Sequence, residues 1–313
     1  MRVYRSLEGV HITKPVVSIG VFDGVHRGHR YLFEKMKEEA RRLGGDTLVI
    51  TFWPHPRLVL NHEPERIRYL STIQGKEELI AACGIDHLVI LEFTERIRSM
   101  DARTFVEEVL VKQVGVKVLV MGFDHVFGRD RKGDFAMVSA LGRELGFRVV
   151  RVEALVIDGK IVSSTLIRDL LWAGDVATAE KMLGYPYFIM GRIVDGKRLG
   201  RSLGFPTANI RPDDEHKLIP RDGVYAVRVY LSGKEYGGML NIGIRPTVSD
   251  GFPRKTIEVH IFDFHGDIYG QDVKVVFVER IRDERKFAGV EELAVQLQKD
   301  KETALRLLGS RSR

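Results

Sequence analysis

Several features are scarce or missing in this chain of 313 residues. Cys83 is its single cysteine, so no disulfide can form within the chain, as is typical of proteins from a reducing compartment. No apolar run approaches the roughly 18 residues that a membrane span needs, and the first residues lack the basic and then apolar pattern of a secretory signal. Internal repeats and low-complexity segments are also missing. We therefore expect a globular, cytoplasmic protein without membrane partners, with Cys83 as a buried side chain that has no chemistry.

The charge balance is basic but mixed. Lys and Arg number 49 against 43 Asp and Glu, a formal net charge of +6. This charge suits anionic partners, which include nucleic acids and phosphorylated small molecules. The basic residues are interspersed with acids, as in residues 34–42, rather than gathered in a stripe with stacking aromatics. We expect small-molecule partners and no nucleic acid, with a nucleic-acid-binding protein as the competing class.

The first half of the chain alternates short apolar runs with helical patterns. After the first run, apolar residues at helical spacing fill 33–43, and Gly44 with Gly45 ends the pattern. Strands that alternate with helices favour βαβ units and a parallel sheet. We predict an α/β domain over residues 1–187, with strands at 16–21, 47–52, 87–91, 116–121 and 147–152 and later helices at 101–113, 165–172 and 176–183.

The second half has a different texture, in which Gly and Pro separate short strands. One amphipathic helix, 290–308, follows and offers Leu293, Leu297, Ala304 and Leu308 to the strands. We predict an antiparallel β-barrel with a terminal helix over residues 188–313, with strands at 188–194, 223–230, 236–242, 255–264 and 272–280.

The segment GVFDGVHRGH, residues 20–29, joins the first strand to the long helix, which we expect to begin near His26. A helix N-terminus offers unpaired N–H groups and the positive end of a dipole, and the glycines let a ligand approach closely. A lone histidine here would as readily be a cap or a surface residue. Two histidines in a glycine frame favour a phosphate site, with the candidate residues Gly20, Phe22, Asp23, Gly24, His26, Gly28 and His29.

Three further segments of the first half carry polar residues at a predicted helix start or just after a predicted strand, where ligands often bind. VSSTLIR, residues 162–168, has hydroxyls at a helix start and an arginine one turn later, which suits phosphate, although a capped helix with a solvated arginine competes. PHPR (54–57) and GFDHVFG (122–128) follow strands, and open parallel sheets bind ligands at that edge. No Gly-x-Ser-x-Gly elbow marks a serine nucleophile. The candidates are Ser164, Thr165, Arg168, His55, Arg57 and Asp124.

In the second half a glycine-rich basic loop, within residues 191–210, leads into Pro-Thr-Ala-Asn. It lacks Gly-Lys-Ser/Thr and so is not a Walker A loop. Thr207 and Asn209 are two residues apart, so on extended chain they point the same way, and their oxygens suit Mg²⁺, although an ordinary turn competes. Gly191, Lys197 and Gly204 are the candidates for approach to phosphates.

Strong alternation marks residues 255–264, where Ile257, Val259 and Ile261 face one side and Glu258 faces the other. Taken alone, this pattern describes a solvated strand face. The neighbouring segments DGVY (222–225), NIGIRPT (241–247) and RDERKF (282–287) add the candidates Tyr225, Asn241, Arg282 and Glu284.

The segments of the first half resemble the nucleotide-binding signatures of the adenylyltransferase superfamily in its flavin-specific form. Those of the second half resemble the bacterial riboflavin kinase domain in order and spacing. The chain is thus similar over nearly its whole length to the bifunctional riboflavin kinases/FAD synthetases. The resemblance implies a Rossmann-like nucleotidyltransferase domain followed by a kinase barrel, with riboflavin, FMN and ATP as substrates, FAD as product and Mg²⁺ as the metal.

The resemblance also implies roles for residues. His26 and His29 would stabilise charge on the α-phosphate of ATP while the FMN phosphate attacks it, and Ser164 and Arg168 would hold the β- and γ-phosphates. Glu258 would be the base that takes the proton of the ribityl 5′-hydroxyl, with Thr207 and Asn209 holding Mg²⁺ and ATP. Arg282 and Glu284 would contact the flavin.

One departure from the family's pattern is His125, where the relatives carry phenylalanine. It leaves open whether Asp124 contacts FMN or stabilises a turn, and whether the adenylylation half is active. Zinc is disfavoured, because His26 and His29 have no convincing third ligand nearby. We expect a monomer or a weak homo-oligomer.

Overall fold

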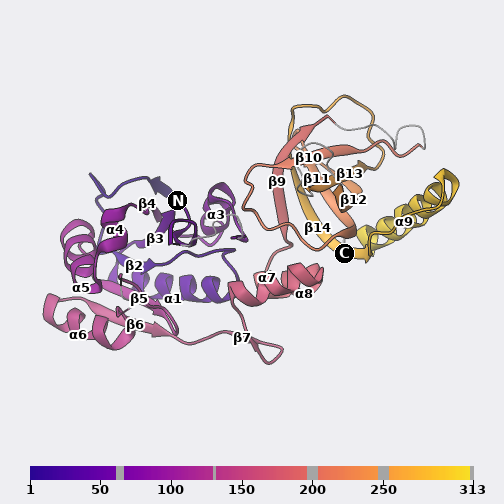
Figure 1. The fold of residues 1–313 in the computed structure, drawn as a ribbon. Helices are drawn as coiled ribbons and strands as arrows, with labels where there is room; N and C mark the ends of the chain where they lie inside the picture. The colour runs from indigo at the N-terminus through magenta and orange to yellow at the C-terminus, as the bar shows by residue number, and fades with distance from the viewer. Residues whose placement is uncertain (61–66, 130–131, 196–203, 246–253, 311–313) are drawn as a thin grey trace. The chain divides into compact units, whose positions relative to one another are not determined.

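The computed structural model describes residues 1–60, 67–129, 132–195, 204–245 and 254–310. The chain divides into two compact units, Met1–Ser164 and Thr165–Arg313 (Figure 1). Helices α7 (Ser164–Ala173) and α8 (Val176–Leu183) fall mainly in the second unit, whereas the expected boundary near residue 187 placed them in the first. The position of the functional boundary stays a prediction.

The first unit contains a six-stranded sheet in the order β1-β4-β3-β2-β5-β6, and every neighbouring pair is parallel. The chain runs from β2 through β3 to β4 on one side and from β5 to β6 on the other. The order therefore reverses between β2 and β5, and open sheets bind ligands at such a switch point, beyond the carboxyl ends of the strands. The strands are β1 (Arg2–Tyr4), β2 (Val16–Ile19), β3 (Thr47–Trp53), β4 (His87–Glu92), β5 (Val118–Gly122) and β6 (Arg148–Val152).

Helices cover both faces of this sheet. Because β–α–β crossovers are right-handed, α1 (Arg27–Leu43), between β2 and β3, and α6 (Phe135–Leu145), between β5 and β6, lie on opposite faces. The predicted parallel sheet and its βαβ unit are confirmed, and α1 ends at Gly44, whose φ of 61° is left-handed. The smaller elements are α2 (Pro56–Leu60), α3 (Ile73–Ala81), α4 (Glu95–Ser99) and the pair β7 (Val156–Ile157) and β8 (Lys160–Ile161).

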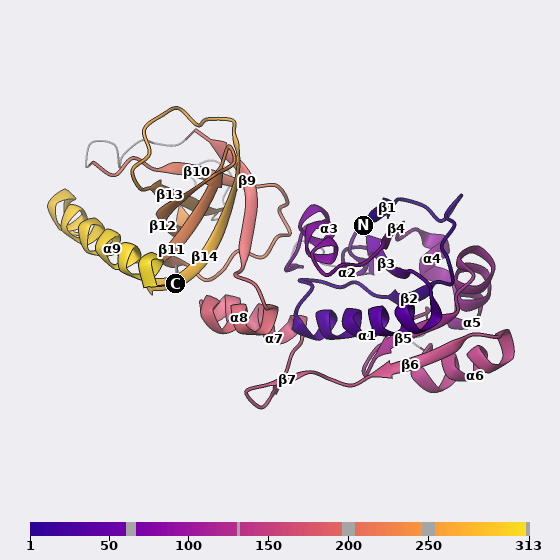
Figure 2. The same cartoon turned by 180° about the vertical axis from the view of Figure 1, so that it is seen from behind.

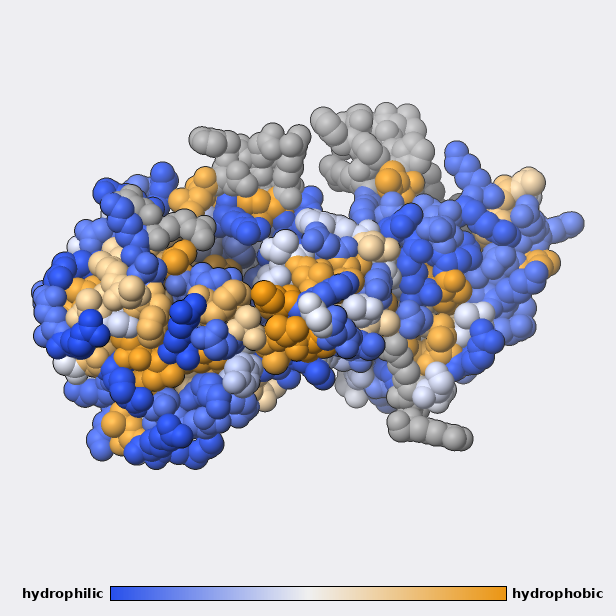
Figure 3. Space-filling model, turned by 90° about the horizontal axis from the view of Figure 1, so that it is seen from below, coloured by the Kyte–Doolittle hydropathy of each residue, from blue (hydrophilic) through white to orange (hydrophobic). Residues whose placement is uncertain are grey.

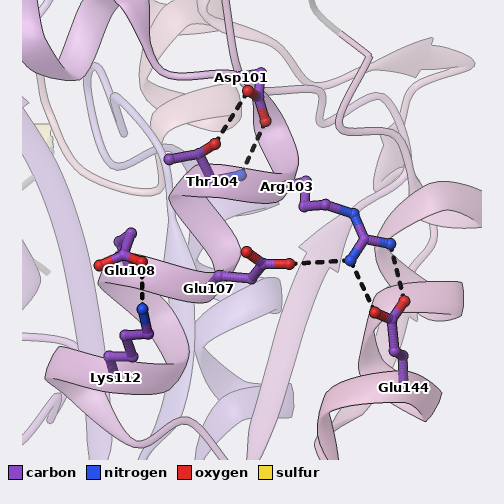
Figure 4. A network of polar contacts seen from close by, with 7 residues as sticks. All are labelled: Asp101, Arg103, Thr104, Glu107, Glu108, Lys112 and Glu144. Atoms are coloured by element: carbon purple, nitrogen blue, oxygen red, sulfur yellow. Dashed lines mark hydrogen bonds and ion pairs between the residues drawn. The ribbon is translucent and has the colours of Figure 1, made fainter.

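The helix expected over 101–113 is present but has two parts. Asp101 caps α5 (Ala102–Phe105), as predicted, by accepting a hydrogen bond from the Thr104 amide at 2.9 Å. The chain then continues as a wider π-helix, Val106–Val114. Arg103 binds the Glu144 carboxylate of α6 with two nitrogens at 2.8 Å each (Figure 4). This pair links α5 to α6, and the apolar core below it packs the π-helix and α6 against one face of the sheet.

The second unit is built on a closed antiparallel barrel in the order β10-β13-β12-β11-β14-β9. The predicted barrel is confirmed, and it contains one strand more than the five predicted, β10, which follows Thr207 directly. The strands are β9 (Phe188–Val194), β10 (Ala208–Pro212), β11 (Gly223–Leu231), β12 (Lys234–Arg245), β13 (Arg254–Ile261) and β14 (Asp272–Arg282).

Helix α9 (Val290–Ser310) lies beside the barrel strands (Figures 1 and 2). Ala304 and Leu308 are buried in a cluster with Met239 and Phe262, and Leu297 packs partly buried against it. The predicted apolar stripe of this helix is thus confirmed, and it covers the outer face of the barrel.

The surface view in Figure 3 is mostly hydrophilic, with apolar patches between the polar residues. Cys83 was expected to be buried but is half-buried, and its Sγ donates to the Leu79 carbonyl oxygen at 3.2 Å. Among the described residues, no helix is both long and apolar enough to cross a membrane.

Candidate functional sites

The loop between β2 and α1 has an unusual backbone. Phe22, Gly24 and Val25 have φ angles of 49°, 80° and 38°. Left-handed conformations are open to glycine but costly for Phe and above all for β-branched Val, so surrounding contacts must impose this shape. Such strain often accompanies a binding site, where the backbone has to present its groups to a ligand.

Asp23 supplies much of that restraint. Its buried carboxylate accepts hydrogen bonds from the Leu70 amide at 2.8 and 3.0 Å and from the Ser71 amide at 3.1 Å. The Gly24 amide in turn donates to Ser71 Oγ at 3.0 Å. These contacts hold the loop against the segment before α3, so the observed role of Asp23 is structural. Its contact with a cofactor stays a prediction.

His26 and His29 form a stacked pair at the start of α1. Their ring centroids lie 3.6 Å apart with an interplanar angle of 19°. His26 caps the helix, because its Nδ1 accepts a hydrogen bond from the His29 amide at 3.4 Å. An accepting Nδ1 places the proton of a neutral His26 on Nε2, so that nitrogen is a donor. Two imidazoles and a helix N-terminus therefore converge, as the sequence predicted.

His29 is held in its neutral form. Burial lowers its pKa well below the usual value, and the charges of His26, Lys76 and His125 lower it further. Its Nδ1 is buried and has no hydrogen-bond partner among the described residues. Buried polar nitrogens are rarely left unpaired in proteins, so this atom points to a ligand or a water.

Two more basic residues belong to this cluster. His125, the departure from the family's pattern, follows β5 at the switch point, and burial lowers its pKa to about 4. Lys76 of α3 is 1% exposed, and burial lowers its pKa to about 8, partly offset by Asp23. Lys76 gave no sequence signal, because it lies inside an ordinary helical stretch.

The other candidates of the first half either lie beside the β2–α1 loop or lie elsewhere and differ in how far they are buried. Gly28 and Ser164 lie beside the loop: a Cβ at Gly28 would meet the His26 ring at 3.2 Å, and Ser164 Oγ donates to the Asp23 carbonyl oxygen at 2.8 Å. A Cβ at Gly20 would lie 3.0 Å from the Phe22 ring, so a larger side chain there would press against this ring. His55 is buried and accepts from the Arg57 amide at 3.1 Å, whereas Arg57, Asp124 and Thr165 are exposed and Arg168 is buried.

In the second unit a cavity of about 230 Å³ lies between the barrel and α9. Leu293 and Leu297 of α9 and Phe205 line its apolar part. Its polar part is lined by Thr207, Asn241, Glu258, His260, Arg282, Glu284 and Asp300. An apolar cavity with a few convergent polar groups is the usual form of a small-molecule site.

Glu258 stands in a row with two asparagines. The register places it opposite Asn209 of β10 on one side and Asn241 of β12 on the other. Residues directly opposite each other in neighbouring strands share a face, so all three side chains project outward. Ile257 and Val259 are buried in the barrel, which confirms the predicted alternation.

Arg282 and Glu284 line the same cavity as Glu258. The Arg282 guanidinium binds both oxygens of Asp300, with its Nε at 3.0 Å from each, and Asp300 is 1% exposed on α9. The Glu284 carboxylate lies over Gly243, where any Cβ would clash with it. Asp300 was not predicted, because nothing in a long charged helix distinguishes one aspartate from its neighbours.

A second cavity, of about 630 Å³, adjoins the first, and Thr207 lines both. His260 fixes the segment that carries Thr207: its Nδ1 lies 2.8 Å from the Pro206 carbonyl oxygen and must donate to it, since a carbonyl only accepts. Burial lowers the pKa of His260, which favours this neutral form. Of the two predicted metal ligands, Thr207 thus lies at the border between the two cavities, and Asn209 lies opposite Glu258 in the neighbouring strand.

The remaining described candidates of the second half do not line either cavity. Tyr225 is fully buried, its ring packs edge-on against Phe277 at 5.2 Å, and its hydroxyl donates to the Arg221 carbonyl oxygen. Gly191 lets β9 approach β10, and Gly204 has a left-handed φ of 78°. Lys197 lies outside the described residues. Ligand contacts by these four stay predictions.

Comparison with known proteins gives a consistent result. The family model described as FAD synthetase matches residues 10–166, and the model described as riboflavin kinase matches residues 183–308. The bifunctional riboflavin kinase/FMN adenylyltransferase of Escherichia coli K12 is 39% identical over 295 residues, covering 94% of this chain and 93% of the relative. The Bacillus subtilis protein of the same name is 36% identical over 313 residues, covering 96% and 98%.

A solved structure is similar over the same span. It is described as a macrolide-efflux protein from Streptococcus pneumoniae, and it matches with a TM-score of 0.87 and 32% identity over 97% of this chain and 98% of its own.

Proposed function

This chain belongs to the bifunctional riboflavin kinase/FMN adenylyltransferase family, and we propose how its two sites divide the work. The second unit phosphorylates riboflavin to FMN with ATP. The first unit adenylylates FMN with a second ATP, giving FAD and pyrophosphate. The observation that carries this assignment is the contrast between a cluster of basic groups in one unit and a carboxylate flanked by amides in the other.

Glu258 performs the step that needs a base. The ribityl hydroxyl of riboflavin is a poor nucleophile until its proton is removed, and a carboxylate within hydrogen-bond reach can accept that proton as the oxygen attacks the γ-phosphorus. The apolar cavity beside α9 suits the flavin ring, and the larger cavity beyond Thr207 suits ATP. ADP then leaves from the side of the larger cavity.

The residues around Glu258 also fit Mg²⁺. The hydroxyl of Thr207 and the amide oxygen of Asn209 are hard oxygen donors, and Mg²⁺ takes few protein ligands because phosphates and water fill the rest of its shell. The described residues contain no cluster of three acidic, histidine or cysteine ligands, which agrees with that mode. When bound, Mg²⁺ neutralises charge on the transferring phosphate.

Adenylylation needs no base, because the attacking group is the phosphate of FMN, which is already ionised near neutral pH. What it needs is stabilisation of charge on the α-phosphate as the phosphate oxygen attacks and pyrophosphate departs. His26 and His29 donate hydrogen bonds there, together with the amides at the start of α1. Ser164 holds the departing phosphates, and phosphate contacts by Thr165 and Arg168 of α7 stay predictions.

Several other expectations also remain proposals. We place FMN contacts at Asp124, His55 and Arg57, which follow the carboxyl ends of β5 and β3. Arg282 and Glu284 orient the flavin in the kinase cavity. The partners are small molecules rather than nucleic acid, the protein acts in the cytoplasm, and it is a monomer or a weak homo-oligomer.

The test is to incubate the purified chain with riboflavin, ATP and Mg²⁺ and to separate riboflavin, FMN and FAD over time. FMN should rise first and FAD should follow. FMN without FAD would mean that the first unit is inactive or specialised, and no turnover of either flavin would refute both assignments.

A further inference from the structure

Lys76 is a buried cation that forms no ion pair with any described residue, and the charge of Asp23 offsets its burial only in part. It is 1% exposed on α3, and its Nζ donates to Thr51 Oγ1 at 3.4 Å, a long bond to a neutral group. The Trp53 ring adds only a distant contact, 5.9 Å from Nζ to the centroid. No carboxylate among the described residues lies within ion-pairing distance of this Nζ. Burying a charge without a partner is costly, so such a residue needs another explanation.

The surroundings of Lys76 indicate what the missing partner is. Thr51 and Trp53 lie at the carboxyl end of β3, next to β2 and its strained loop. The charge of Lys76 acts on His29, whose Nδ1 is itself buried and unpaired among the described residues. Two under-satisfied basic side chains from different helices thus share one edge of the sheet, where an anion would satisfy both.

We propose that Lys76 is a further cationic residue of the adenylylation site and that the phosphates of bound nucleotide supply its missing partner. This inference rests on the function proposed above for the first unit. Without nucleotide the buried charge lowers the free energy of unfolding. With nucleotide bound, it stabilises the negative charge of the phosphates. Lys76 therefore lowers the stability of the nucleotide-free protein and raises its affinity for nucleotide.

Burial lowers the pKa of Lys76 to about 8, so part of the empty protein carries it neutral in mildly alkaline solution. A bound phosphate favours the charged form and raises that pKa, so nucleotide binding near pH 8.5 takes up protons. The other titratable groups that face this pair are Asp23, His26, His29 and His125. Aspartate and histidine side chains ordinarily titrate far below pH 8.5, and burial lowers the pKa of His29 and His125 further. The uptake is thus specific to Lys76.

The main variant is Lys76→Met, which keeps the length and removes the charge. We expect FMN adenylylation to fall about tenfold or more, as for the loss of one charge-assisted hydrogen bond. The melting temperature of the empty protein should be unchanged or higher, and its rise on adding ATP and Mg²⁺ should be smaller than in the wild type. Riboflavin phosphorylation, measured on the same preparation, should stay within twofold of the wild type.

Lys112→Met is the matched control, since Lys112 is an exposed lysine of the same unit, paired with Glu108. It should change neither activity. Adenylylation by Lys76→Met within twofold of the wild type would overturn the proposal. So would a loss of activity accompanied by a lower melting temperature and an unchanged response to ATP, because that pattern belongs to a purely structural lysine.

A second measurement needs no folded methionine variant. Calorimetric titration of a non-hydrolysable ATP analogue at pH 8.5, in buffers of different ionisation enthalpy, should show proton uptake by the wild type. Lys76→Arg, which stays charged at every accessible pH, should bind the analogue without that uptake. Absence of uptake by the wild type, or equal uptake by Lys76→Arg, would overturn the proposal. Failure of the wild type to make FAD would instead refute the function of the first unit.

Discussion

The two units handle the same co-substrate with opposite electrostatics. The first gathers Lys76, His26, His29 and His125 around a strained loop, and the carboxylate in that loop, Asp23, is occupied by backbone amides. The second presents a carboxylate, Glu258, between two asparagines. Under the proposed function the difference follows the nucleophile, since an ionised phosphate needs its charge tolerated, whereas a neutral hydroxyl needs its proton removed. The charge of each site therefore follows from the group that attacks ATP, and not from ATP itself, which both sites bind.

The largest expected effect is at the base. Glu258→Gln keeps the size and loses the proton acceptor, so riboflavin phosphorylation should fall roughly a thousandfold, the usual scale for a general base. Adenylylation of added FMN should be unchanged. The measurement is the rate of FMN formation from riboflavin, and a loss below tenfold would show that the hydroxyl needs no base from this residue.

The second effect tests the first unit. His29→Ala removes a donor that we place at the α-phosphate, and adenylylation should fall roughly a hundredfold, as for loss of one preorganised donor. The chain should still convert riboflavin to FMN and then stop. If FAD formed from FMN at the wild-type rate, the stacked histidines would be structural.

The third prediction concerns the ion pair that ties α9 to the kinase cavity. Asp300→Ala leaves Arg282 without its main partner in a largely buried place, which should destabilise the protein by about 3 kcal/mol. The KM for riboflavin should rise more than kcat falls, because Arg282 lines the cavity wall. Denaturant unfolding and steady-state kinetics measure the two effects.

Asp283→Ala is the matched control for that variant. Asp283 also pairs with arginines, but its side chain is 71% exposed, so its loss should change stability little. Equal effects of the two substitutions would contradict the account of a buried pair that shapes the cavity.

The smallest effect on activity concerns His125. Its pKa of about 4 lies below the usual 6.5, so the unfolded chain binds a proton between these values while the folded protein does not. Stability is therefore full above pH 6.5 and falls as the pH drops toward 4, by up to about 3 kcal/mol from this residue.

His125→Phe should flatten this pH dependence and keep adenylylation at pH 7 within about threefold, because the replacement conserves an aromatic ring. Thermal unfolding between pH 4 and 7 tests the first expectation. An unchanged slope would mean that other groups cause the acid loss, and abolished adenylylation would make His125 part of the chemistry.

Much of the fold could be predicted from the sequence because local patterns determine it. Alternation at 255–264 placed Ile257 and Val259 inside and Glu258 outside, and glycine ended α1 where expected. Strand β10 was harder, because Pro-Thr-Ala-Asn can form a turn or a strand and only pairing with β9 and β13 decides it. The π-helical half of the 101–114 helix has no sequence signature either.

The sites divide in the same way. For residues in glycine-rich or strongly alternating segments the position could be predicted, as for His26 and His29 at the start of α1 and Thr207 and Glu258 at the barrel cavity, while their roles stay predictions. Lys76, Asp300 and His260 could not, since their importance comes from burial beside residues far away in the chain. Asp23 shows another case, because the fold gives its carboxylate to the Leu70 and Ser71 amides, which the motif did not indicate, while its predicted ligand contact stays a prediction.

The most direct test of the division of labour follows the phosphorus atoms of ATP. The wild type is incubated with riboflavin and Mg²⁺ in parallel reactions, one with label on the γ-phosphate of ATP and one with label on the α-phosphate. The account predicts that γ-label appears in FMN and passes into FAD, whereas α-label appears in FAD alone, and only when His29 is intact. Label from the α-phosphate in FMN, or FAD formed from riboflavin without γ-label, would contradict it.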